Sequence, residues 1–385
     1  RPEKIGGWTK YSNSTFLGVC RSLHDWASLE SIRYIGIGTH LKFYVNQGAS
    51  YHDVTPIRST TSAGDVTFAA TNGSSTITAT DTAHGSNIND FVTFSDAASL
   101  GGNVTAAVLN QEYQIASVPT ANTFTFVAKD TSGTTVTANA SDSGNGGSST
   151  VGAYQINVGL NAYVEGTGWG AGSWGEGTFG SVSSLSASSQ LRLYSQDNFG
   201  EDLIFNVRAG GVFYWDESSG TSNRAVALSA LGGASNTPTA ALQVLVSDVD
   251  QHVICFGVNP IGSSNIDPLF VRWSDQESAA DWTPTATNTA GGARINSGSR
   301  IVGAVQSRQE ILVFTDVSLH SMRFIGSPFI FQFSTLSTDI SMVSPNAAVN
   351  ARGIVYFMDK GNFYTYNGAV QPLTCIWQSK LRASV

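Results

Sequence analysis

The chain has 385 residues, of which 41% are apolar and 12% are charged, and its formal net charge is −8. The apolar share is enough for a sizeable core and excludes wholesale disorder. The acidic balance, without any run of Lys and Arg, excludes a broad basic field that would attract nucleic acid.

Short β-rich runs that occur in pairs dominate the sequence, and almost no segment shows helical periodicity. In each pair an apolar run is followed by a turn and a second run, at residues 34–46, 202–216, 252–274, 310–326 and 354–368. The last four pairs begin roughly 40 to 60 residues apart, which is the period of a four-stranded propeller blade. The spacing therefore predicts an all-β chain built on a β-propeller platform.

A composition shift separates the first pair from the second. From about Ser59 to Thr150 the chain becomes rich in Thr, Ser and Ala, and the tripeptide TNG at 71–73 is typical of a hairpin turn. The stretch SDSGNGGSST at 141–150 indicates a flexible return linker. We expect a small β-barrel or sandwich module at 59–150. It would be inserted between the start of the propeller at 1–58 and blades at 151–385, which we expect to continue beyond the chain end.

A glycine- and aromatic-rich segment, GTGWGAGSWGEGTFG, follows at 166–180 and is too irregular for a blade strand. Its start fits G-x-G-x-x-A loosely. A dinucleotide site needs a strand before this pattern and a helix after it, whereas more Gly, Ser and Trp follow here. We expect a long loop in which Trp169 and Trp174 could anchor a subunit interface.

The stretch LFVRWSDQESAADWTP at 269–284 begins as a strand and continues as a charged loop. Asp275, Glu277 and Asp281 could act as acids and bases or bind a cation. Catalytic carboxylates usually converge from different strands, however, and these three are local and lack the calcium-loop spacing. We therefore favour a solvated loop that is pinned at its two ends by Trp273 and Trp282.

Other chemical motifs are missing from the sequence. No two of the six histidines have H-x-H or H-x-x-H spacing, there is no G-x-S-x-G elbow, and the three cysteines are widely spaced without a CxxC pair. Cys255 and Cys375 lie in apolar runs, which favours buried, reduced thiols. No run of 18 apolar residues predicts a membrane-spanning helix. We expect no enzymatic activity, no cofactor and no metal site.

The tryptophans allow two interpretations. Trp169, Trp174, Trp215, Trp273 and Trp282 could stack on sugars or bases, or they could seal blades against each other. Blade packing is favoured for Trp215 and Trp273 because both lie in expected strands.

The C-terminal half carries distinctive motifs: RWSDQE…DWTP at 272–284, SGS.I at 297–301, RQEILVFTD.SLHSM at 308–322 and GSPFIFQF at 326–333. Through them the chain resembles the tail nozzle or tail tube proteins of short-tailed bacteriophages. TAHG at 82–85 and the residues at 121–126 resemble a small β module that is inserted in many phage tail proteins. The resemblance covers 250–385 well, the insert moderately and the first 58 residues weakly.

This resemblance implies a structural protein of the virion tail. Its subunits would form a homo-hexameric ring below the portal and adaptor, with contacts to head–tail connector and tail fibre proteins. Viral DNA would pass through the ring without sequence-specific binding, and few Lys or Arg contacts to phosphates would then be an advantage. We expect the subunit interface in loops 166–180 and 274–292, with Trp169, Trp174, Trp273, Asp275, Glu277 and Trp282. The alternatives are a receptor-binding or a glycan-degrading propeller protein of the tail.

Overall fold

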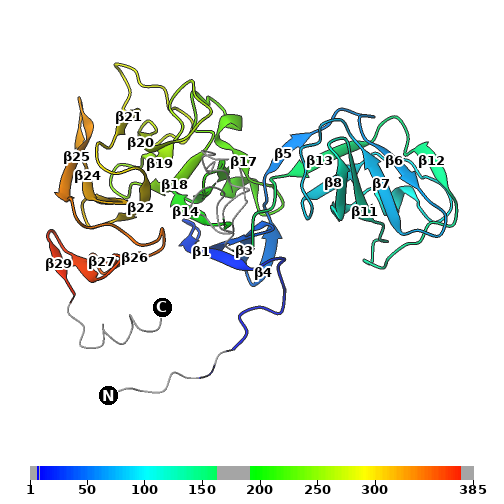
Figure 1. The fold of residues 1–385 in the computed structure, drawn as a ribbon, viewed down its shortest axis with the longest axis horizontal. Coiled ribbons are helices and arrows are strands. Elements are labelled where there is room, and N and C mark those ends of the chain that lie inside the picture. Colours follow the sequence, from blue (N-terminus) through cyan, green and yellow to red (C-terminus); the bar gives the residue numbers. More distant parts are fainter. Residues whose placement is uncertain (1–6, 8, 163–190, 374–385) are drawn as a thin grey trace, which may run out of the picture. The chain divides into compact units, whose positions relative to one another are not determined.

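The computed structural model describes residue 7 and residues 9–162 and 191–373. Strands dominate this part of the chain (Figure 1), and its helices are short, namely α1 (Ala106–Leu109) and two 3₁₀ turns at Glu217–Ser219 and Leu228–Ala230. The chain forms two compact units: unit 1 comprises Arg1–Arg192 and Ser218–Ala225, and unit 2 comprises Leu193–Glu217 and Val226–Val385.

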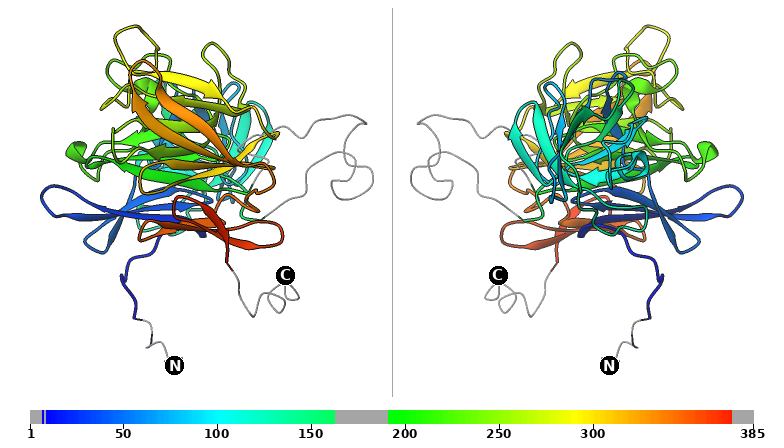
Figure 2. Two further views of the ribbon diagram at one scale, coloured as in Figure 1. Left: turned by 90° about the vertical axis from the view of Figure 1, so that its left-hand side faces the viewer. Right: turned by 90° about the vertical axis from the view of Figure 1, so that its right-hand side faces the viewer.

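The described part of unit 2 contains four antiparallel sheets, and the four strands of each sheet pair in chain order. The first two sheets contain β14 (Tyr194–Phe199), β15 (Asp202–Val207), β16 (Val212–Trp215) and β17 (Val226–Ala227), then β18 (Ala241–Val246), β19 (Val253–Val258), β20 (Asp267–Trp273) and β21 (Gly291–Arg294). The last two contain β22 (Ile301–Gln306), β23 (Ile311–Thr315), β24 (Leu319–Gly326) and β25 (Ile330–Ser337), then β26 (Ala348–Ala351), β27 (Ile354–Met358), β28 (Phe363–Tyr366) and β29 (Val370–Pro372). Figure 2 shows the long β24–β25 hairpin (orange) as a strongly twisted ribbon.

The inner strands of these sheets are continuous apolar runs because both of their faces are covered. All six residues of β19 (VICFGV) and all five of β23 (ILVFT) are buried. Three apolar clusters lie between successive sheets and contain residues from both neighbours. Contacts also link β14 to β18, β18 to β22 and β22 to β26, the first strands of the four sheets. Sheets that stack face to face through their first strands are propeller blades, so the predicted fold class is confirmed.

Unit 1 begins with one more sheet of this kind, formed by β1 (Cys20–Ala27), β2 (Arg33–Thr39), β3 (Phe43–Gln47) and β4 (Ser50–Asp53). Two further sheets follow. One has the strand order β10-β11-β7-β6-β12 and the other the order β5-β13-β8-β9. Their bounds are β5 (Ile57–Thr60), β6 (Thr67–Ala70), β7 (Thr76–Thr80), β8 (Phe91–Ser95), β9 (Glu112–Gln114), β10 (Ser117–Thr120), β11 (Thr123–Val127), β12 (Asp142–Asn145) and β13 (Val151–Gln155).

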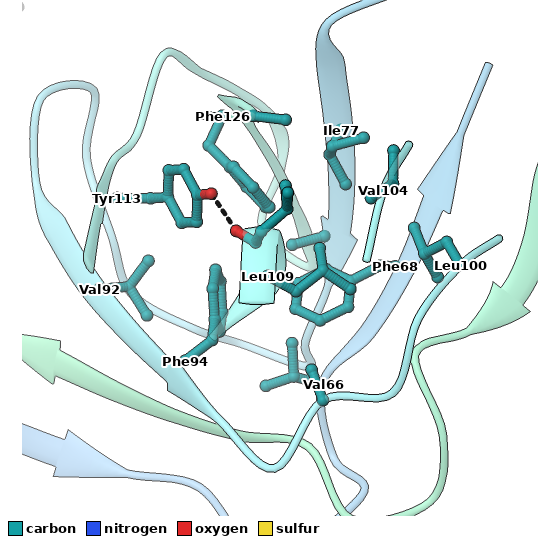
Figure 3. Packing of buried hydrophobic residues seen from close by; sticks show 14 of the residues in the cluster. Val66, Phe68, Ile77, Val92, Phe94, Leu100, Val104, Leu109, Tyr113 and Phe126 are labelled. Atoms are coloured by element: carbon teal, nitrogen blue, oxygen red, sulfur yellow. Dashed lines mark hydrogen bonds between the residues drawn. The ribbon is translucent and has the colours of Figure 1, made fainter. Parts of the chain in front are cut away.

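These two sheets share one core, so the inserted module is a β-sandwich. Aromatic rings fill its centre (Figure 3): Phe68 and Phe94 meet edge to face at 4.8 Å between ring centroids, and Tyr113 lies 4.3 Å from Phe126. The Tyr113 hydroxyl donates to the Val108 carbonyl of α1, which gives this buried polar group a partner. Packing of this kind accounts for the alternation of apolar and polar residues in the insert.

Two turn predictions for the insert have opposite outcomes. The TNG hairpin is confirmed, since Gly73 adopts a φ of +81° between β6 and β7. The predicted flexible linker at 141–150 is wrong, because β12 lies within it and pairs with β6. Gly146 explains the close packing of this stretch: a Cβ atom there would lie 2.7 Å from Phe68 Cδ2. Glycine here permits close approach rather than flexibility.

A cluster of charges ties the sandwich to the β1–β4 sheet within unit 1. Lys42, with only 4% of its side chain exposed, lies 2.6 Å from Asp53 Oδ2 and also contacts Glu112 of β9. Arg224 bridges the same two carboxylates at 3.2 and 3.3 Å. Burial raises the pKa of Asp53, but Lys42 and Arg224 outweigh this and hold the pKa below its ordinary value. The buried charge of Lys42 therefore has two partners of opposite sign.

Candidate functional site

The loop between β20 and β21, residues 274–290, contains most of the site residues predicted from sequence. It leaves the sheet at Trp273 and returns at Gly291, and these two residues face each other in the β20–β21 register. A Cβ atom at position 291 would lie 2.6 Å from the Trp273 ring, so glycine is required where the loop re-enters the sheet. Loops of this length without their own secondary structure are uncommon and are often functional.

Trp273 is buried and faces the next blade. Its ring meets Phe331 of β25 edge to face at 5.1 Å, and its Nε1–H donates to the Thr289 carbonyl at 2.9 Å. One side chain therefore seals two blades and holds the end of the loop, which agrees with the predicted role in blade packing.

Trp282 is also buried, with 1% of the residue exposed. Its Nε1–H donates to the Ala279 carbonyl at 2.9 Å, and the Arg272 guanidinium lies 5.7 Å from its ring centre. Arg272, itself 2% exposed, donates to the Asn259 carbonyl at 3.1 Å and also to the carbonyls of Asn236 and Trp282. The indoles of Trp273 and Trp282 thus face the interior of the chain, and their predicted part in a subunit interface stays a prediction.

Asp281 joins the loop to the segment before β18. Its Oδ1 accepts from Ser235 Oγ at 2.5 Å and from the Thr283 N–H at 3.1 Å, and its Oδ2 accepts from Asn288 Nδ2 at 3.0 Å. The hydrogen bond from Ser235 and those from Thr283 and Asn288 hold the pKa of Asp281 below its ordinary value. The carboxylate is an ionised acceptor that orders the loop.

Asp275 closes the other side of the loop. Its Oδ1 accepts from both the N–H and the hydroxyl of Thr289, at 2.8 and 2.6 Å. Its own N–H donates to the Asp281 carbonyl at 2.8 Å. Partial burial raises the pKa of Asp275, but the hydrogen bonds from Thr289 outweigh it and keep the pKa below its ordinary value.

The Thr289 hydroxyl also contacts a buried histidine. His252 Nε2 lies 2.9 Å from Thr289 Oγ1, and His252 Nδ1 lies 2.5 Å from Asp250 Oδ2. Phe324 and Phe331 flank the His252 ring, with centroids at 5.7 and 5.3 Å. The order Asp–His–Thr matches the arrangement of a nucleophile, its base and an orienting carboxylate.

The Thr289 hydroxyl takes part in the hydrogen bonds that hold the loop. It donates to Asp275 at 2.6 Å and accepts from the Gln276 N–H at 2.9 Å, and His252 Nε2 is its third contact. A carboxylate of the loop thus holds the hydroxyl proton of Thr289. This chain of groups therefore fixes the loop to the β18–β19 hairpin.

The exposed part of the loop is small and polar. Glu277 is exposed, has a φ of +57°, and donates its N–H to the Gln251 carbonyl at 3.1 Å. Residues 284–287, of sequence PTAT, form a second exposed stretch. Trp169 and Trp174 lie outside the described residues, so the predicted contact through loop 166–180 stays a prediction.

Sequence reasoning grouped Trp273, Asp275, Asp281 and Trp282 correctly in one loop but missed their partners. Ser235 and His252 come from other parts of the chain, and no local spacing links them to the loop. Arg272 lies inside the RWSDQE…DWTP motif. Its position next to Trp273 in an expected strand is the one feature of the sequence that indicates a buried cation beside the loop. A cation in an otherwise apolar run needs a fixed partner when it is buried.

In the described part of the chain, no group of three or more His, Cys, Asp and Glu side chains is placed to hold a metal ion. No helix among the described residues is long and apolar enough to cross a membrane. Burial raises the pKa of Cys255 to about 12, so its thiol is protonated at neutral pH.

Comparison with protein-family models finds no match to this chain, and comparison with curated proteins finds none either. Among solved structures, the chain is similar to the phage phi92 endosialidase, with 12% identity and a TM-score of 0.29, over 88% of this chain and 52% of that chain. It is also similar to the extracellular domain of BT4673 from B. thetaiotaomicron in two structures, each with 8% identity and a TM-score of 0.32. Those matches cover 92% and 94% of this chain but 33% and 34% of those chains. The chain thus spans between a third and about half of the length of these structures, and likenesses of this size carry no argument about function.

Proposed function

We propose that the chain is a structural subunit of a phage tail nozzle or tail tube, located in the virion tail and without enzymatic activity. The observation that carries the proposal is how the side chains of the RWSDQE…DWTP motif are used, since through this motif the chain resembles that family. Their polar atoms form hydrogen bonds within the chain that hold one loop in a fixed shape, as the contacts of Arg272, Asp275, Asp281 and Trp282 show. A loop that is ordered in advance on a rigid blade suits a subunit contact, because little conformational freedom is lost on assembly.

The proposed assembly is a homo-hexameric ring that meets adaptor and tail fibre proteins and lets DNA pass. A ring needs a heterologous interface, in which one surface of a subunit meets a different surface of the next. The exposed segments of the loop, Gln276–Glu277 and 284–287, are the proposed contacts. The net charge of −8 supports free passage of DNA, since a chain with more acidic than basic side chains offers few contacts to phosphates.

A glycan-degrading role would assign catalysis to the loop carboxylates. A glycosidase needs two carboxyl groups about 5 to 10 Å apart, one of them protonated. Both Asp275 and Asp281 have a lowered pKa and accept several hydrogen bonds, which suits neither for the acid. These properties support the structural proposal over the enzymatic one.

Class averages of negatively stained particles, together with sedimentation velocity of the purified chain, test the assembly. The expected result is a closed ring with sixfold symmetry. A trimer on the particle, or a chain that stays monomeric up to high micromolar concentration and is absent from tails, would overturn the proposal.

A further inference from the structure

Unit 1 contains a cleft of about 470 Å³ that the proposed tail role does not use. Three segments line it: the turn between β2 and β3, the loop before β8 with the end of β9, and the chain after β13. Their polar side chains in the cleft are His40, Asn87, Asn89, Gln114 and Asn161. A volume of this size lies within the range of small-molecule sites.

The walls of the cleft are fixed by buried hydrogen bonds. Asp90, 1% exposed, accepts from the N–H groups of Asn87 and Val158, both at 2.7 Å, and from Asn157 Nδ2 at 2.6 Å. On the opposite side the Gly159 N–H donates to the His40 carbonyl at 2.9 Å. The cleft is therefore formed before any ligand arrives, which lowers the entropic cost of binding.

His40 is a neutral donor in this setting. Burial lowers its pKa, and the positive charges of Arg21 and Arg192 lower it further. Its Nδ1 accepts from the Val19 N–H at 3.0 Å, so the single ring proton of the neutral imidazole sits on Nε2.

The remaining polar groups are amides, and in the described part of unit 1 no Asp, Glu, Lys or Arg side chain lines the cleft. Each amide side chain offers both a donor and an acceptor, as a sugar hydroxyl does. A wall without charged side chains offers an ion no direct ion pair in exchange for its lost hydration. Ile88, 54% exposed at the same cleft, can cover the apolar C–H face of a sugar ring.

We propose that this cleft binds a short uncharged oligosaccharide. Recognition rests on the amide side chains of Asn87, Asn89, Gln114 and Asn161 and on the His40 donor. Among the described residues no Phe, Tyr or Trp ring lines the cleft, so binding at one site is weak, and several copies in one particle would raise the avidity. The inference goes beyond the tail-nozzle proposal and does not depend on it.

Saturation-transfer NMR on the full chain tests the site with three neutral trisaccharides: maltotriose, mannotriose and triacetylchitotriose. The comparison probes are anionic trigalacturonate and a blocked tetra-alanine peptide. We expect transfer to at least one neutral trisaccharide, with binding at least tenfold tighter than for either comparison probe.

The variant for the test is Asn87→Ala combined with Asn161→Ala. The described residues contain no hydrogen-bond partner for either amide side chain, so folding should be preserved. Loss of two ligand hydrogen bonds should weaken binding about tenfold or more. Asn72→Ala removes an exposed amide from the β6–β7 turn of the same unit and should leave binding unchanged.

Three results would overturn the inference: no transfer to any neutral trisaccharide, equal binding by the double variant, or tighter binding of the peptide. A ring that assembles normally while the double variant loses sugar binding would separate this site from the proposed tail function.

Discussion

The sandwich core and the loop at 274–290 are both ordered and closed at their centres, but different forces hold them. In the sandwich, buried apolar side chains from two sheets pack into one cluster around Phe68, Phe94 and Phe126. In the loop, two carboxylates, a guanidinium and hydroxyl groups satisfy one another and the backbone around Trp282. The sandwich therefore depends on buried area and the loop on complete pairing of polar groups.

This difference predicts different sensitivities. A core that is held by area should tolerate polar changes at its surface and lose stability when a large side chain is truncated. A loop that is held by polar pairing should lose stability when a single charge or proton is removed, because the group that was bonded to it stays buried without a hydrogen-bond partner.

The largest effect is expected for Phe126→Ala in the sandwich. Phe126 is fully buried and contacts both Tyr113 and Phe68, so truncation should cost about 3 to 5 kcal/mol of unfolding free energy. Residues 57–155 contain no tryptophan. Calorimetry should therefore show a lowered sandwich transition, whereas tryptophan fluorescence of the blades should stay unchanged. A loss below about 1 kcal/mol would show that the sandwich does not depend on this ring.

The next effect is expected for Arg272→Met in the blade beside the loop. Methionine keeps much of the side-chain volume but leaves the carbonyls of Asn259 and Asn236 without their donor. The cost should be about 2 to 3 kcal/mol, with a change in the Trp282 fluorescence. Arg294→Met is the matched control, since the ion pair of Arg294 with Asp267 is exposed and should contribute less than about 1 kcal/mol. Equal effects in the two variants would contradict the role of polar pairing in the loop.

The fold was largely predictable from sequence because blade strands have a strong local pattern. Runs such as VICFGV and ILVFT are apolar throughout, which follows from coverage on both faces, and turn residues separate them. The prediction of a flexible linker at 141–150 was wrong because glycine can serve either flexibility or close packing. Sequence alone cannot tell a flexible glycine from one that, like Gly146, lets the chain approach Phe68.

The site was less predictable because its partners are far apart in sequence. The sequence suggested Trp282 as a surface anchor because it is an aromatic residue in a loop. The direction of its side chain, however, depends on Arg272 and on Ser235, which lies in the segment before β18 and is hydrogen-bonded to the loop. Trp282→Ala is consequently a poor test of a subunit interface, because it would also remove a buried ring from the loop.

A smaller effect, on the order of 1 kcal/mol, is expected for Asp275→Asn at neutral pH, with a distinct pH dependence. The pKa of Asp275 is lowered by folding, as is that of Asp281. Their contribution to stability is therefore present above the unfolded pKa of about 4 and is lost as the pH falls through the lower folded pKa. Below about pH 4 the native protein should lose stability more steeply than Asp275→Asn, and the double variant with Asp281→Asn should lose it least. Parallel unfolding curves from pH 6 to pH 2.5 for all three proteins would contradict this assignment.

The smallest effect on stability is expected for Glu277→Gln, at the exposed tip of the same loop. The carboxylate is exposed and the residue holds its place through its backbone N–H, so the unfolding free energy should change by less than about 0.5 kcal/mol. If the loop forms the proposed subunit contact, however, removal of this charge should alter the salt dependence of ring assembly, because charges at the rim of an interface act mainly on association rates. Sedimentation velocity from low to high salt measures this, with Glu30→Gln, an exposed acid in unit 1, as the matched control. Unchanged assembly would place the interface elsewhere. A stability loss above about 1 kcal/mol would show that the exposed carboxylate of Glu277 also stabilises the loop. The distinction between paired interior groups and free surface groups would then not hold.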